Sequence, residues 1–154
     1  MKNILNEADY SEIKNRIQHL SDTNTRRWGN LELQEMLIHC TTQLQLALGE
    51  ISHKQQGPSF MRSKLGKWLL FSTIPWPKGA ETPNEMNAGI ASFSVTDIEN
   101  EKTVLLNYLE KVRQQTQLKS HPFFGELNRK EWSRLIYKHL DHHLTFVFYF
   151  IYYQ

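Results

Sequence analysis

The stretch Asn-Arg-Lys-Glu-Trp-Ser-Arg-Leu-Ile-Tyr-Lys-His-Leu-Asp-His-His-Leu, residues 128–144, carries the pattern that decides the fold. Asn128 followed three residues later by Glu131 is typical of the start of a helix with a capping box. At about 100° per residue, five apolar residues in and beyond the stretch fall within about 100° of one another, the width of a core-facing stripe: Trp132, Leu135, Ile136, Phe146 and Phe150. The pattern predicts an amphipathic helix from Arg129 through the histidines.

Three of the seven histidines lie within five positions of this helix. His139 and His143 fall inside the apolar arc, about 40° apart and one turn along the axis, while His142 lies at its margin and Asp141 on the opposite side. Two imidazoles on adjacent turns can bind one metal ion. A buried pair that satisfies its ring nitrogens without a metal fits the pattern equally well.

Three other segments carry a helical period: 9–20, 30–49 and 96–117. Asp9, Asn30 and Thr96 are the expected N-caps, and Gly49 is the expected stop of the second helix. The three apolar stripes are Ile13, Ile17 and Leu20; Leu33, Met36, Leu37, Cys40, Leu44 and Ala47; and Ile98, Leu105, Tyr108, Leu109 and Val112. Cys40 therefore lies on a buried face, as a small core residue rather than a nucleophile.

A long connection separates the second and third of these helices. Residues 59–71 are predicted to hold a short helix in which Phe60, Leu65, Trp68 and Leu69 share a face, and the prolines of 74–84 exclude regular structure after it. Four long helices with one long crossover predict an all-α, four-helix bundle. The aromatic tail after Leu144 either prolongs the last helix or packs against a partner.

A third metal ligand would have to come from another helix, and the candidate is His39. On its own wheel it falls roughly 60° outside the Met36 edge of the stripe, so its direction alone does not demand burial. Glu35, one turn earlier, fits a surface carboxylate better than an outer partner of a metal site. For His19, His53 and His121 we expect ordinary solvated or hydrogen-bonded roles.

The composition is that of an ordinary globular domain, with 40% hydrophobic and 22% charged residues among 154. A net charge of +2 with scattered basic residues does not predict nucleic-acid binding. The apolar run 146–153 is far shorter than the roughly 20 residues that a bilayer-spanning helix needs. A single cysteine and the absence of a signal-peptide pattern favour the cytoplasm. We expect one domain over residues 1–154, without nucleic-acid or membrane partners.

Arg-Trp-Gly-Asn-Leu…Met-Leu-Ile-His-Cys (27–40) and His-Pro-Phe-Phe-Gly-Glu-Leu…Glu-Trp…Tyr-Lys-His-Leu-Asp-His-His-Leu (121–144) resemble a bacterial branch of the DinB/YfiT-like superfamily. The resemblance implies a four-helix bundle with a divalent metal ion held by one histidine of the second helix and two of the last, here His39, His139 and His143. The chain departs from the pattern in its more aromatic tail and in having no clear carboxylate base beside the histidines.

Three histidine ligands would leave a coordination position open for water or substrate, unlike a closed structural zinc site. The resemblance implies a metalloenzyme acting on a small molecule, with thiols among the candidate substrates and transfer or hydrolysis as the reaction. Zinc and nickel are the first candidates for the metal, and iron also suits imidazole ligands. Arg62, Lys67 and Lys78 could attract an anionic substrate, although solvated side chains are their default.

The rival hypothesis is a non-catalytic helical bundle with structural histidines, in which the aromatic tail forms a homodimer or partner interface. A small-ligand sensor that uses the same site without turnover is a third alternative.

Overall fold

The computed structural model describes residues 1–26, 31–52, 57–72, 74, 76, 97–145 and 147–148. Four long helices dominate it: α1 (Glu7–Gln18), α2 (Leu33–Leu48), α5 (Ile98–Gln114) and α6 (Arg129–Leu144). Between α2 and α5 lie the short 3₁₀ helix η1 (Ser59–Arg62) and the short helix α3 (Lys64–Leu70). Two short strands, β1 (Thr25–Arg26) and β2 (Val147–Phe148), complete the described elements.

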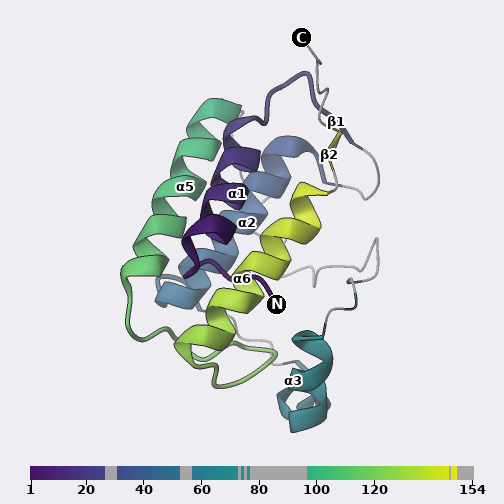
Figure 1. Ribbon diagram of the computed structural model, residues 1–154, viewed down its shortest axis with the longest axis vertical. Coiled ribbons are helices and arrows are strands. Elements are labelled where there is room, and N and C mark those ends of the chain that lie inside the picture. The colour runs from purple at the N-terminus through teal and green to yellow at the C-terminus, as the bar shows by residue number, and fades with distance from the viewer. Residues whose placement is uncertain are drawn as a thin grey trace.

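The four long helices lie side by side as a helical bundle (Figure 1), in which α1 and α6 run one way and α2 and α5 run the other. Each amphipathic helix turns its apolar stripe inward, and together the stripes form one core. The largest fully buried side chains come from all four helices and the N-terminal segments beside α1: Trp132, Ile4, Ile13, Ile17, Leu20, Met36, Leu37, Leu44, Leu105, Leu109, Leu135 and Ile136. The predicted helical fold is therefore confirmed, while its likeness to the DinB/YfiT-like arrangement stays a prediction.

The pairing of β1 with β2 was not predicted. The two strands are antiparallel, with Thr25 opposite Phe148 and Arg26 opposite Val147. They join the end of the chain to the segment that leads into α2 (Figure 1). Of the two alternatives for the tail, continuation of the last helix does not hold for the described residues 145, 147 and 148, because α6 ends at Leu144, Thr145 caps it and β2 follows. Two residues per strand are too few for an alternating pattern to be read from sequence.

Helix starts differ from the predicted ones by a few residues. The side chain of Asn6, not Asp9, caps α1 by accepting a hydrogen bond from the Asp9 backbone N–H at 3.0 Å. Glu32 stands at the N-cap of α2, and Asn30 lies outside the described residues. Asp97 caps α5, next to the predicted Thr96, which also lies outside them. Gly49 ends α2 as predicted, with the left-handed φ of 75° that glycine favours.

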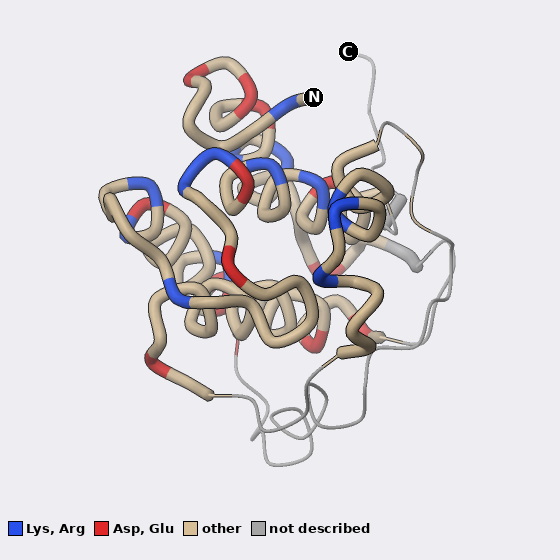
Figure 2. Tube along the Cα trace, turned by 90° about the horizontal axis from the view of Figure 1, so that it is seen from below, with Lys and Arg blue, Asp and Glu red and all other residues tan. Residues whose placement is uncertain are grey.

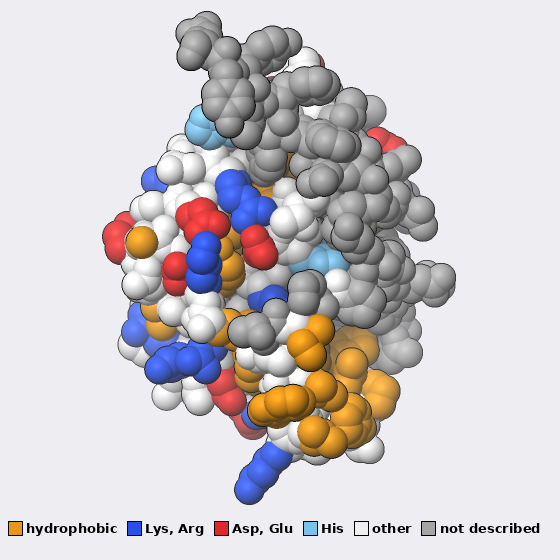
Figure 3. Space-filling view, turned by 45° about the vertical axis from the view of Figure 1, so that its right-hand side comes forward, with side chains coloured by type: hydrophobic (Ala, Val, Ile, Leu, Met, Phe, Trp, Pro, Cys, Tyr) orange, Lys and Arg blue, Asp and Glu red, His pale blue; other side chains and the backbone are white. Residues whose placement is uncertain are grey.

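The four apolar residues that were predicted to share one face of a short helix are exposed to solvent, and they are divided between η1 and α3. Trp68 is 63% exposed and Leu65 56%, and Phe60 and Leu69 are exposed as well. Figure 3 shows hydrophobic side chains gathered at this lower end of the molecule. Elsewhere, basic and acidic residues are interspersed along the described helices (Figure 2). None of the described helices is both long and apolar enough to span a bilayer.

Two basic residues considered for substrate attraction instead hold η1 and α3 against the loop before α6. Arg62 donates to the carbonyl oxygen of Pro122 at 2.9 Å, and Lys67 donates to that of Glu126. Both side chains are thus engaged with backbone oxygens of the loop before α6. Lys78, the third candidate, lies outside the described residues.

Candidate metal centre

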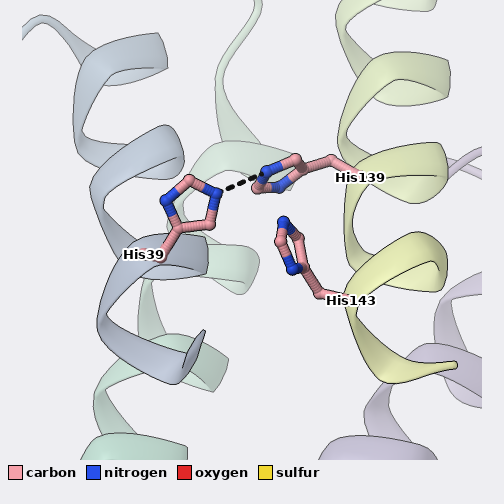
Figure 4. Close-up of side chains that lie close together, drawn as sticks. All are labelled: His39, His139 and His143. Atoms are coloured by element: carbon pink, nitrogen blue, oxygen red, sulfur yellow. Dashed lines mark hydrogen bonds between the residues drawn. The ribbon is translucent and has the colours of Figure 1, made fainter. Parts of the chain in front are cut away.

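The structure brings the three predicted ligands together in the bundle interior. His39 reaches from α2 toward His139 and His143 on the facing turns of α6 (Figure 4). The Nε2 atoms of His39 and His139 lie 3.0 Å apart. The centroids of the three rings are separated by 4.5–4.9 Å. One ring nitrogen from each residue can be chosen so that all three lie within 4.8 Å of one another.

Local helix geometry accounts for the α6 pair, since residues four apart lie one above the other on the same face. His39 needs a tertiary explanation, because its own stripe does not include it. The α2 flank that carries His39 is buried as well, and only 2% of His39 remains exposed. The neighbouring turns show the same wide burial, with Ile38, Gln43 and Leu46 also buried.

Burial keeps the three imidazoles neutral. It lowers the pKa of His39 to about 4 and that of His143 to about 2, and it lowers the pKa of His139 as well. The neighbouring histidines act in the same direction, because a second positive charge nearby would be unfavourable. Neutral imidazole is the form that binds a metal ion, so the ligands are in the required state at neutral pH.

The polar atoms of the cluster are incompletely satisfied by the described protein. The Nε2 atoms of His39 and His139 share one hydrogen bond, which needs a proton on one of them. The Nδ1 atoms of His39, His139 and His143 are buried without a hydrogen-bond partner in the part of the chain that the structure describes. A buried polar atom left unpaired costs about 1–3 kcal/mol. The described residues therefore leave one ring nitrogen of each of the three histidines unsatisfied.

These donors fit a divalent ion such as zinc. Zinc binds imidazole nitrogen at about 2.0–2.1 Å, so two such nitrogens on a tetrahedral ion lie roughly 3.3 Å apart. The 3.0 Å between the Nε2 atoms of His39 and His139 is close to that separation. The three chosen nitrogens lie within 4.8 Å of one another, so the ligands would draw somewhat closer together around a bound ion. The cluster could therefore hold a metal ion, with three protein ligands.

One side of the cluster is lined by residues that the sequence analysis did not single out. The Trp76 ring lies 6.1 Å from the His139 ring and 5.8 Å from the His142 ring, centroid to centroid. Lys138 donates to the carbonyl oxygens of Leu70 and Ser72, both at 2.9 Å, and so holds the connection after α3 against α6. No sequence pattern indicated Trp76, because a proline-flanked tryptophan in a long connection has no periodicity to place it.

His142 takes the marginal position predicted for it. It is half-buried, and its ring lies 5.2 Å from that of His143 and beside Trp76. Its neighbour Asp141 points toward α1, where its Oδ1 accepts a hydrogen bond from Arg16 at 2.6 Å. Asp141 therefore provides no carboxylate on the Trp76 side.

Glu35 is a partly exposed carboxylate in the first turn of α2, in agreement with the predicted surface role. Its Oε2 accepts a hydrogen bond from the Glu32 backbone N–H at 2.8 Å, which closes the capping box of α2.

His19 and His121 are not members of the three-histidine group. His19 is exposed at the end of α1, as expected. His121 is buried, and its Nδ1 accepts a hydrogen bond from the Phe123 backbone N–H at 3.1 Å, so it has the ordinary hydrogen-bonded role. His53 lies outside the described residues.

A protein-family model described as "Protein of unknown function (DUF1569)" matches residues 2–149 of the chain. Neither a curated protein nor a solved structure matches it.

Proposed function

The chain belongs to the DUF1569 family, and we propose that it binds a divalent metal ion through His39, His139 and His143. The observation that carries this proposal is the convergence of three buried imidazoles from two antiparallel helices, with the Nε2 atoms of His39 and His139 facing one another. An apolar interior accepts such groups only when they are satisfied. A shared ion would satisfy the nitrogens that face one another.

The protein is, in this proposal, a metalloenzyme acting on a small molecule by transfer or hydrolysis, with thiols among the substrates. Three histidines leave room for a further ligand on the ion, which supports catalysis over a structural role. A bound divalent ion would act as a Lewis acid and lower the pKa of water or a thiol that completes its coordination. The chain's own contribution is to hold the ligands neutral and oriented and to cover the site with Trp76.

Zinc and nickel are the ions we propose first, with iron(II) as the next choice, because all three accept imidazole donors. We also propose a distant relationship to the DinB/YfiT-like superfamily. The origin of the ligands in the second and last long helices supports it. So do the four long helices themselves.

A structural histidine cluster is the second candidate, and one observation favours it. The contact between the Nε2 atoms of His39 and His139 can pair two imidazoles without any ion. In that case the protein is a non-catalytic interaction or ligand-sensing bundle. The two candidates differ in whether the purified protein holds a metal.

Metal quantification on purified protein tests the proposal. We expect about one divalent ion per chain, the stoichiometry of a three-histidine site. His39→Ala, His139→Ala and His143→Ala should each lose it. His19→Ala is the matched control, since His19 is exposed at the far end of α1 and should leave the metal content unchanged.

Circular dichroism on each variant separates loss of the ion from loss of the fold. Should His39→Ala unfold, its metal content is replaced by that of His39→Gln, which keeps a polar side chain of similar length. A wild-type protein that binds no divalent ion even after reconstitution would support the structural cluster instead, and so would well-folded histidine variants that retain the metal.

A further inference from the structure

The charge around the candidate metal centre is unbalanced. Three neutral imidazoles leave both positive charges of a divalent ion uncompensated, in a site where the ligands are at most 9% exposed. Burying net charge is costly unless an opposite charge accompanies it. The question is which group supplies that negative charge.

The helices that form the site do not supply it. The acidic residues of α2 and α6 are Glu35, Glu131 and Asp141. Glu35 and Glu131 each accept a backbone N–H at 2.8 Å to close the capping boxes of their helices. Asp141 is paired with Arg16 on the α1 side. Within the described residues of α2 and α6, every carboxylate is thus engaged elsewhere.

The flank of α6 beside the site is cationic instead. Arg134 and Lys138 are four residues apart, so they lie along one face of the helix. Lys138 directly precedes His139, and its Nζ lies 5.6 Å from the centre of the Trp76 ring. The Nε of Arg134 is buried without a hydrogen-bond partner in the described part of the chain.

We infer that the ligand which completes the metal site is a small organic anion. Its charged donor atom binds the ion, and its apolar part packs against Trp76. The inference rests on the proposed metal site and names the substrate class for it. Attraction to the cationic flank adds to that of the ion, and both are strong because the site is largely excluded from water. A neutral ligand gains neither benefit.

Trp76 supplies the apolar wall. Its ring contacts the rings of both His139 and His142. Lys138 binds the carbonyl oxygens of Leu70 and Ser72, a few residues before Trp76, and so holds that part of the connection near α6. An aromatic face of this kind favours flat or apolar groups next to the charged donor. Among anions with the same donor group, those with an aromatic part should therefore bind more tightly.

The experiment uses the full chain loaded with cobalt(II), whose visible absorption reports the ligands of the ion directly. Acetate, benzoate and neutral imidazole are titrated separately into the loaded protein. We expect saturable spectral changes with both carboxylates and tighter binding of benzoate than of acetate. Trp76→Ala should remove the preference for benzoate.

Lys138→Met tests the role of charge. It should weaken acetate binding roughly tenfold, the effect of removing one nearby unit charge, and leave imidazole binding unchanged. Lys138→Arg should restore acetate binding. Lys130→Met is the matched control, because Lys130 is an exposed lysine on the same helix and should alter neither titration.

The outcomes separate this inference from the metal site itself. Failure to bind cobalt overturns both. A cobalt spectrum that responds to imidazole but not to carboxylates overturns the inference alone, because the fourth ligand is then not an anion. Equal weakening of acetate and imidazole in Lys138→Met also overturns it, since Lys138 would then only position the connection.

Discussion

The histidines of this chain differ in their burial and in their hydrogen-bond partners, and these differences separate the candidate metal ligands from the others. His19 is exposed and its Nδ1 contacts the Asn15 carbonyl oxygen at 2.7 Å, so it has no special chemistry. His121 is buried, but backbone N–H groups satisfy it. His39, His139 and His143 are buried without such partners for Nδ1 in the described residues, and their rings lie together in a group that could hold a metal ion. The same burial makes them acid-sensitive.

The metal-free protein should lose stability as the pH falls. The pKa of His39 is about 4 in the folded chain and 6.5 in its ordinary state. Between these values the unfolded chain binds a proton that the folded chain does not, so the free energy of unfolding decreases toward acid. For His39 alone the loss is roughly 3 kcal/mol by the lower limit of this window, at about 1.4 kcal/mol per pKa unit.

Urea denaturation of the metal-free protein across this pH range measures the effect. His39→Gln removes one titrating group and should make the dependence shallower. Equal slopes for His39→Gln and the wild type would contradict the assignment of a depressed pKa to His39.

At the scale of single elements, local capping sets where the helices begin. The side chain of Asn128 accepts a hydrogen bond from the Glu131 backbone N–H at 2.9 Å, and Glu131 returns one to the Asn128 N–H at 2.8 Å. This box starts α6 at Arg129 and so sets the register in which His139 and His143 face inward. The predicted start of α6 is confirmed because the box is local in sequence.

Asn128→Ala should lower the free energy of unfolding by about 1 kcal/mol, because one N-terminal N–H of α6 loses its acceptor. Thermal or urea unfolding measures the change. Asn107→Ala is the matched control, since Asn107 lies at an exposed position inside α5 where alanine is the better helix former. A loss in Asn107→Ala equal to that in Asn128→Ala would show that the cap is not responsible.

At the scale of the whole molecule, the antiparallel packing of α2 against α6 makes the site. His39 comes from one helix and the other two ligands from the second, about 100 residues further along the chain. Contacts with α1 hold α6 in place, through the ion pair of Arg16 with Asp141 and the hydrogen bond of Tyr137 to Glu12 at 3.1 Å. A bound ion would therefore link two helices that are distant in sequence.

Zinc should raise the midpoint of thermal unfolding, since it binds the folded state and stabilises it by about 2.7 kcal/mol at a free concentration of 100 times the Kd. His39→Ala should abolish most of this gain although the α6 pair is intact. His19→Ala should keep it. A gain that survives in His39→Ala would show that the ion is held by α6 alone.

The sequence by itself determined the four long helices, the inward direction of His139 and His143, and the burial of Cys40, which is 1% exposed. These follow from short-range geometry, because a helix places residues three and four apart on one face whatever surrounds it. Helix starts were predicted less well, since several competing caps stood within a few residues of one another.

Only the tertiary structure decided the burial of His39, the approach of Trp76 to the site and the pairing of β1 with β2. A helical wheel gives the angle of a side chain but not which neighbour covers that flank. Such cover results from packing between segments far apart in the chain, whose contacts no local period encodes. The third histidine is therefore a ligand candidate because α6 lies against its side of α2.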